Sequence, residues 1–222
     1  NGNGTAGIVT LNTPNINLTN SNLSSSTAGK GDAGNINING NNLEINNTTL
    51  SSEARENATG NAGSVNLNTV NNLTLNNTTL SSEVRENATG NAGSVSLTGT
   101  DITASNNTQL LTSSDGNGNA GQVTITGNSS LTFNDSKASS AIESNGNGIA
   151  GIVEFNAPNI NLTNSNLSSS TSGKGDAQNV TIDGNQISLN NTTLSSEVRE
   201  NATGNAGSVS LTGTDITASN NT

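Results

Sequence analysis

The residues best suited to chemistry in this chain are its carboxylates, and the densest group of them recurs three times. The motif Glu-x-Arg-Glu occupies residues 53–56, 83–86 and 197–200. Stacked copies of such a motif form ion pairs on a solvated edge, and each pair contributes little to stability. We therefore expect a charged surface ridge, with ligand binding as the alternative role, made of Glu53, Arg55, Glu56, Glu83, Arg85, Glu86, Glu197, Arg199 and Glu200.

Acid–base catalysis lacks its usual residues here. Glycoside hydrolysis requires two carboxyl groups at a fixed separation, but Asp32, Glu44 and Asp176 occupy repeated positions rather than one cluster. The chain has no His, and an abundant Ser without a base is not an activated nucleophile. Lys30 and Lys174 are equivalent corner residues, which indicates a surface role. The sequence therefore predicts no catalytic residues and a protein that is not an enzyme.

A metal or cofactor site is not predicted either. Residues 115–119, Asp-Gly-Asn-Gly-Asn, begin like a calcium-binding loop, but Ala120 stands where Gly is needed and Thr126 replaces the final Glu. The Gly-Asn-Gly runs at 116–119 and 145–148 lack the context of a phosphate-binding loop. We interpret these segments as polar turns.

Hydroxyl side chains recur at one position of each repeat, on the side of a predicted strand that faces inward. A buried hydroxyl needs a hydrogen-bond partner, and a stacked column of hydroxyls can find one in the neighbouring repeat. We predict a structural role for this inward column, which consists of Ser25, Ser52, Ser82, Thr112, Ser140, Ser169 and Ser196.

The composition narrows the class of protein. Of the 222 residues, 45 are Asn and 62 are Ser or Thr, while Tyr, Trp, His, Cys and Met are absent. Such polarity is typical of disordered chains, but disorder does not produce the strict spacing of aliphatic residues seen here. The net charge of −10 disfavours nucleic acid and anionic membranes as partners. No apolar run reaches the length of a bilayer span, so we expect no membrane insertion, and an export signal would lie outside these residues.

Internal repeats account for the whole chain. An Ala followed by Gly or Gln opens each unit, and the units are 27–30 residues long. Seven complete units and a partial eighth fill residues 1–222, so we predict a single domain. The opening Ala residues stand at positions 6, 33, 62, 92, 120, 150, 177 and 206.

Each unit contains three short apolar alternations, such as those that begin at Val65, Leu73 and Leu80. A spacing of two predicts β-strands with one buried face. The gaps between the three strands stay at seven or eight residues, and only the return to the next unit varies, at 13 or 15 residues. This pattern predicts a right-handed parallel β-helix with three short strands per coil. We expect the Asn-Ala-Gly corners at 61–63 and 91–93 to adopt left-handed backbone and to stack their amides.

The unit at 60–67 and 73–82, Gly-Asn-Ala-Gly-Ser-Val-Asn-Leu followed by Leu-Thr-Leu-Asn-Asn-Thr-Thr-Leu-Ser-Ser, resembles a known repeat. It is similar to the repeats of filamentous-haemagglutinin-like exoproteins, in particular the Asn-rich cyanobacterial type. The resemblance implies a right-handed β-helix, two-partner secretion through an outer-membrane pore, and adhesion or matrix building at the bacterial cell surface. The amino-terminal secretion domain of that family is not among these residues.

Two internal copies bear on the extent of the repeat. Residues Asn76–Thr108 recur unchanged as Asn190–Thr222, and the first coil, 6–32, recurs with few changes from Ala150. The chain starts and stops in mid-repeat, so we expect a window of a longer repetitive protein, because solenoid ends need polar caps.

The function that we predict is a structural rod or fibre segment of a secreted bacterial surface or matrix protein, related to adhesion or biofilm. We expect such rods to associate end to end or with flanking repeats, because open strand edges pair readily. The alternative is a glycan-binding face with outward residues such as Thr10, Thr124 and Thr126. Ice binding requires a regular Thr-x-Thr array, and the varied outward residues of the first strands disfavour it.

Overall fold

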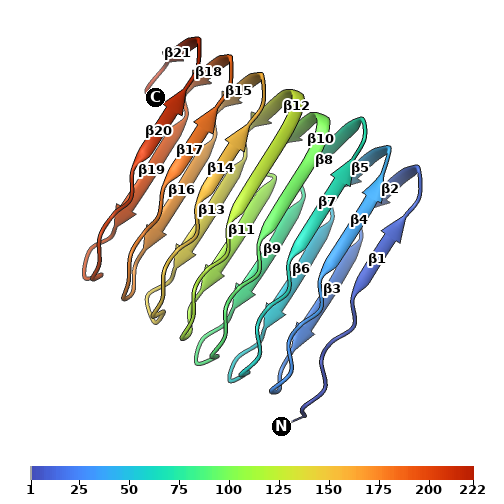
Figure 1. Ribbon diagram of the computed structural model, residues 1–222, viewed down its shortest axis with the longest axis vertical. Coiled ribbons are helices and arrows are strands. Elements are labelled where there is room, and N and C mark those ends of the chain that lie inside the picture. The colour runs from blue at the N-terminus through green and yellow to red at the C-terminus, as the bar shows by residue number, and fades with distance from the viewer. Residues whose placement is uncertain (1) are drawn as a thin grey trace.

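The protein is a parallel β-solenoid of about seven turns, as Figure 1 shows for the computed structural model. The structure describes residues 2–222, and these residues form strands and turns without any helix. Successive coils stack along one axis, and the first strands of the coils lie side by side in front of the third strands. The predicted fold class is confirmed.

The first strand of each coil carries the alternation that begins with Val or Ile. Val9 pairs with Ile36, Ile36 with Val65, and the series continues through Val180 and Val209. Every predicted inward position of this strand therefore stacks on its equivalent in the next coil. The separate first strands are β1 Val9–Asn12, β4 Ile36–Gly40, β7 Val65–Thr69, β14 Val153–Asn156, β17 Val180–Asp183 and β20 Val209–Thr212.

The second strand follows after a short corner and belongs to the same hydrogen-bonded sheet as the first. It has one buried and one outward face, which matches its alternation of aliphatic and polar residues. Six coils have a separate second strand: β2 Asn15–Thr19, β5 Asn42–Asn46, β8 Asn72–Asn76, β15 Asn159–Thr163, β18 Gln186–Asn190 and β21 Asp215–Ser219.

In the fourth and fifth coils the first and second strands are one continuous strand. These are β10, Val95–Ser105, and β12, Val123–Asn134. The two long strands pair with each other across the corner, where Gly99 faces Gly127 before an irregularity in the register. Sequence analysis predicted three separate strands in every coil. In these two coils the corner residues also pair with the neighbouring coil, so the first and second strands form one strand.

The third strand forms a separate seven-stranded parallel sheet behind the first (Figure 1). Its inward Leu or Ala column is in the predicted register, for example Leu50 with Leu80. The strands are β3 Asn22–Thr27, β6 Thr49–Ala54, β9 Thr79–Val84, β11 Gln109–Ser114, β13 Lys137–Ile142, β16 Asn166–Thr171 and β19 Thr193–Val198.

The core lies between the two sheets and is made of stacked aliphatic columns. The only two Phe residues, Phe133 and Phe155, meet edge to face with ring centroids 5.2 Å apart. Burial of these columns supplies the main apolar driving force for stacking, because one coil has no partner for its inward side chains until the next coil covers them.

The turn from the second to the third strand uses left-handed backbone at an Asn or Asp in every coil, as at Asn47, Asn77 and Asp135. Asn tolerates this conformation better than most residues. The predicted left-handed corners at 61–63 and 91–93 are wrong, because Asn61 and Asn91 do not have positive φ. Glycine is needed at these corners because the stacked turns lie very close together. A Cβ on Gly93 would lie 2.5 Å from the carbonyl carbon of Gly63 in the coil before.

Candidate functional site

The inward Ser/Thr column crosses the interior from the third strand to the glycine turn that precedes the first strand. Ser52 donates its hydroxyl to the carbonyl oxygen of Gly34 at 3.1 Å and accepts the backbone N–H of Gly63 at 2.8 Å. Gly34 belongs to the same coil and Gly63 to the next. The hydroxyls therefore link successive coils through glycine backbone rather than through one another.

Other members of the column make equivalent bonds. Ser25 joins Gly7 and Gly34, Ser140 joins Gly121 and Gly151, and Ser196 joins Gln178 and Gly207. Ser82 accepts the N–H of Gly93 at 2.7 Å, and Ser169 donates to Gly151 while it accepts from Gln178. Thr112 differs, since it donates to the carbonyl of Gly121 at 2.6 Å. All seven predicted positions hold interior hydrogen bonds.

A second buried hydroxyl column lies at the corner between the second and third strands. Thr78 donates to the carbonyl oxygens of Ile45 and Asn76, and Thr192 repeats this arrangement with Leu162 and Asn190. Sequence analysis missed this column, although each member directly follows the left-handed Asn or Asp of the corner. The described members are Thr48, Thr78, Thr108, Ser136, Ser165 and Thr192.

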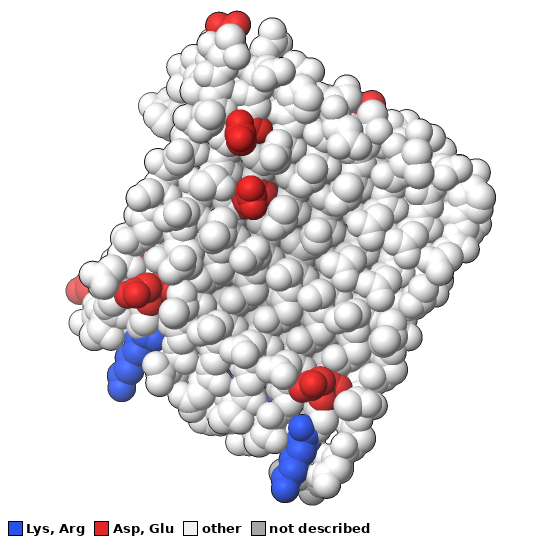
Figure 2. Space-filling view, viewed as in Figure 1, with Lys and Arg blue, Asp and Glu red and all other residues white. Residues whose placement is uncertain are grey.

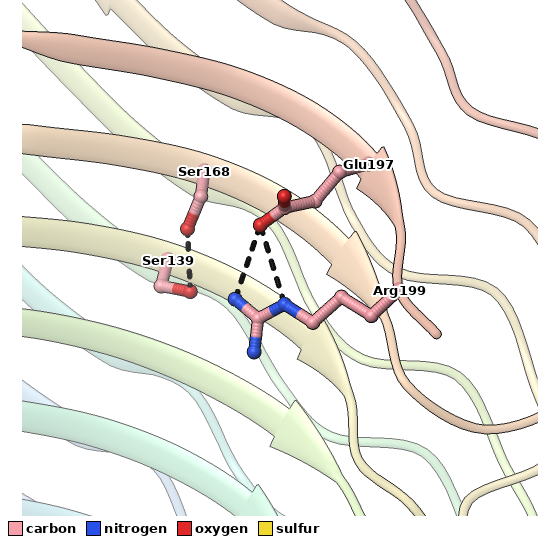
Figure 3. Close-up of polar contacts among 4 residues, drawn as sticks. All are labelled: Ser139, Ser168, Glu197 and Arg199. Atoms are coloured by element: carbon pink, nitrogen blue, oxygen red, sulfur yellow. Dashed lines mark hydrogen bonds and ion pairs between the residues drawn. The ribbon is translucent and has the colours of Figure 1, made fainter. Parts of the chain in front are cut away.

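The predicted charged ridge is divided into two parts. Arg85 binds Glu53 of the previous coil at 2.9 Å and Glu83 of its own coil at 2.8 Å. Figure 3 shows the second part, where Arg199 binds Glu197 at 3.2 Å within one coil. Between these parts the strand position of Glu83 is occupied by small residues, Ser113, Ala141 and Ser170. The remaining members of the ridge, Arg55, Glu56, Glu86 and Glu200, are exposed.

Glu83 is the most deeply buried carboxyl group of the ridge, with 15% of its side chain exposed. Burial raises the pKa of Glu83, and this effect exceeds the opposing influence of the Arg85 charge. The negative charge of Glu53 in the neighbouring coil adds to the increase. Burial and the Arg85 charge therefore act in opposite directions on the ionisation of Glu83, and burial has the larger effect.

Small side chains leave a hollow of about 290 Å³ beside this ion pair, on the outer face of the third strands. Ser113 and Ala141 lie in it, with Glu83 on one side and Lys137 and Glu143 on the other. Ser139 also lines the hollow, and its hydroxyl lies 3.0 Å from that of Ser168 in the next coil (Figure 3). Both signs of charge border the hollow, so it has no clear preference for an anion or a cation.

Two longer grooves lie on the outer face of the second strands. One has a volume of about 490 Å³ and crosses the last four coils, and the other has about 390 Å³ and crosses the first three. The outward side chains that line them are amides and hydroxyls for the most part, with a few carboxylates. They are Ser130, Thr132, Asn159, Asn161, Gln186, Ser188, Asp215 and Thr217 in the first groove, and Asn15, Asn17, Asn42, Glu44, Asn72 and Thr74 in the second.

The face over the first strands carries few charges. Figure 2 shows this face as white apart from scattered acidic side chains, with Lys and Arg at the lower edge. In the first three coils its Asn side chains form a ladder, in which Asn68 donates to Asn39 at 2.9 Å and Asn39 donates to Asn12 at 2.7 Å. Thr124 and Thr126 face outward on β12, four coils away from Thr10, so these three predicted residues do not form one array.

Within residues 2–222, no group of three or more His, Cys, Asp or Glu side chains is placed to hold a metal ion. The same residues contain no helix that is long and apolar enough to cross a membrane. No protein-family model, curated protein or solved structure matches this chain.

Proposed function

We propose that this chain is a segment of a non-catalytic structural rod in a secreted bacterial surface or matrix protein. The observation that carries the proposal is the uniform stacking: each first strand pairs in parallel with its equivalent through all eight coils. At one strand spacing per coil, the described coils extend for roughly 35 Å. Such a repeat lengthens a molecule by a constant step without changing its cross-section.

The exterior supports an extracellular location. Asn, Ser and Thr cover the outer faces, and their amide ladders bond with each other from coil to coil. The sequence resemblance to filamentous-haemagglutinin-like repeats favours export by two-partner secretion and a role in adhesion or biofilm. Contact with flanking repeats or with other rods through the strand edges is part of this proposal.

Electron microscopy of the purified chain at several concentrations tests the rod. We expect rods that lengthen into thin filaments, with an axial spacing of about 4.8 Å in diffraction. Short rods at every concentration would contradict end-to-end association and would leave the chain as a spacer. Immunogold labelling of intact source cells tests the location, and label found only after permeabilisation would contradict a surface protein.

The polar grooves favour glycan binding as a second candidate function. Amides and hydroxyls that converge along a groove bind hydroxyl-rich ligands by paired donors and acceptors. The neutral lining of Thr132, Asn161 and Ser188 suits an extended neutral polysaccharide better than a charged one. No described aromatic side chain lies in the groove to stack on a sugar ring, so hydrogen bonds would supply the affinity.

A glycan array with matched variants tests this second candidate. We expect Thr132→Ala and Asn161→Ala to weaken retention of a neutral polysaccharide, because each removes a groove hydrogen-bonding group. Thr193→Ala, on the exposed outer face of β19 in the other sheet, serves as the control. Equal loss in all three variants, or retention of no neutral glycan by the unaltered chain, would contradict a glycan-binding groove.

A further inference from the structure

Three residues that depart from the repeat meet on the outer face of the third strands. Among the seven third strands, only β11 has Leu at the middle outward position, Leu111, where the others have Ser. Only β13 begins with a charged residue, Lys137, and only β13 has Ala at the last outward position, Ala141. All three line the hollow of about 290 Å³ described above. A uniform stack requires none of these changes, so their convergence marks a site.

The corner directly after these strands shows a fourth departure, which is a reversal of charge. Aligned corner residues donate their backbone N–H to the last strand residue of the coil before, as Arg85 does to Ala54 and Glu143 to Ser114. The second, third and seventh coils have Arg at this position, whereas the fourth and fifth coils have Asp115 and Glu143. Both carboxylates line the same hollow. Acidic groups therefore gather at the corner end of the hollow.

Two charges at opposite borders of the hollow have no ion-pair partner among residues 2–222. They are Lys137, which begins β13, and Glu143, which directly follows this strand. Arg85, by contrast, is held between Glu53 and Glu83. Six residues of extended chain separate Lys137 from Glu143, so their Cα atoms are roughly 20 Å apart. The hollow thus has a positive and a negative end.

The floor between these ends consists of small and apolar side chains. Leu111 and Ala141 form its apolar part, and Ser113 and Ser139 lie beside them. A ligand that satisfies both ends needs a cationic group near Glu143, a carboxylate near Lys137 and small or apolar groups between them. An extended peptide of roughly five or six residues has this length and this separation of charge.

We propose that this hollow binds a short extended peptide with a cationic group at one end and a carboxylate at the other. The peptide lies along β13, with its cation toward Glu143 and Asp115, its carboxylate toward Lys137 and its middle on Leu111 and Ala141. A neutral polysaccharide would leave both charges unpaired, and a simple ion would use only one end. The site is independent of the rod and of the grooves on the second strands.

NMR titration of the full chain with the peptide Ala-Ser-Ala-Ala-Ser-Ala, with free termini, tests the proposal. We expect saturable shifts of amides in β11 and β13, with a Kd of about 1 mM or tighter. Acetylation of the amino terminus or amidation of the carboxyl terminus should each weaken binding about fivefold, because each removes one charge. Acetyl-Lys-Ala-Ser-Ala-Ala-Glu-amide distinguishes the source of the peptide. Binding of this capped form identifies a segment within a larger protein, and binding of the free-ended form alone identifies a free peptide.

Variants that restore the residue of a neighbouring coil remove the site without disturbing the repeat. They are Leu111→Ser, Lys137→Asn and Ala141→Ser, since Ser139, Asn166 and Ser170 hold these positions in the next coil. The combined variant should unfold at a similar temperature and lose binding. Lys137→Asn alone should weaken the free-ended peptide but not its carboxyl-amidated form, whereas Glu143→Gln should weaken the free-ended peptide but not its amino-acetylated form. Glu200→Gln, at an exposed corner of the seventh coil, is the control and should change neither.

Four results would overturn the proposal. The first is no binding at peptide concentrations up to about 10 mM, and the second is equal affinity for a peptide with both ends blocked. The third is unchanged binding by Lys137→Asn and Glu143→Gln, which retain the apolar floor. The fourth is a shift of the same amides with the concentration of the chain alone, which would assign the hollow to contact between copies.

Discussion

The side-chain oxygen of Ser52 lies 2.8 Å from the backbone nitrogen of Gly63 and accepts its hydrogen bond across the interior of the solenoid. The same hydroxyl donates to the carbonyl oxygen of Gly34 in its own coil. One small side chain therefore satisfies a donor and an acceptor that would otherwise be buried without partners. Repetition of this contact in most coils fixes the position of the glycine turn relative to the third strand.

Replacing Ser52 with Ala should destabilise the protein by about 1–3 kcal/mol, because both glycine backbone groups lose a partner. Urea unfolding of the two proteins measures the difference. Ser24→Ala is the matched control, since Ser24 lies on the exposed side of the adjoining third strand, and a change of less than about 0.5 kcal/mol is expected there. A similar loss of stability in both variants would show that the interior hydrogen bonds of Ser52 add no stability of their own.

Two threonines on the inward side of the third strands should respond in opposite directions to replacement by Val. Thr171 Oγ1 is buried and has no hydrogen-bond partner among the described residues, so Thr171→Val should stabilise the protein by about 1 kcal/mol or more. Thr112 donates to Gly121 at 2.6 Å, so Thr112→Val should destabilise it by a similar amount. Thermal unfolding of both variants measures the direction of each change in stability. A loss of stability in Thr171→Val as well would contradict the interpretation that the Thr171 hydroxyl has no partner.

A methyl group on a stacked glycine should disrupt the turn. Gly90 has φ +148°, and a Cβ there would lie 2.5 Å from the carbonyl oxygen of Gly60. Overpacking of this kind costs about 1–3 kcal/mol, so Gly90→Ala should unfold at lower urea concentration. Gly4→Ala is the control, because Gly4 holds the same place in the first coil with nothing within 4 Å. Equal stability of the two variants would show that the glycine turns are not tightly stacked.

The raised pKa of Glu83 predicts how stability depends on pH at this position. A carboxyl whose pKa is higher in the folded state than its ordinary value of 4.5 binds its proton more tightly when folded. The contribution of Glu83 to stability therefore decreases as pH rises through the interval above 4.5. Glu83→Gln should match the unaltered protein in acid and become relatively more stable toward neutral pH.

Chemical unfolding of both proteins across that interval measures the relative stability of Glu83→Gln. Glu86→Gln removes a charge from the same corner at an exposed position and corrects for the change in net charge. A stability difference between Glu83→Gln and the unaltered protein that stays constant with pH would contradict the raised pKa.

Most of the fold could be predicted from the sequence because the positions of individual aliphatic residues reveal the repeat. The alternation at Val65 and Leu67 defines which side of a strand is buried, and the recurrence of the same alternation in each unit defines which residues pair. Both are local properties of the chain. They hold in every coil whatever the neighbouring coil contains.

The remaining features depend on contacts between coils. The continuous strand β10 is one example, because it pairs with β12 across the corner, and the alternation of residues 95–105 alone does not predict this contact. The hydrogen bond that the Gly63 N–H donates to Ser52 is another, because these residues belong to different coils and to opposite sides of the interior. The spacing of aliphatic residues does not predict a hydrogen bond that crosses the interior in this way.

The parallel pairing of every strand has a consequence for any assembly of these coils. All coils point the same way along the axis, so the two ends of the stack expose different backbone groups and different side chains. The rod therefore has a polarity, like a filament whose two ends are chemically different. Two such rods side by side can lie parallel or antiparallel, and the two arrangements bring different side chains into contact.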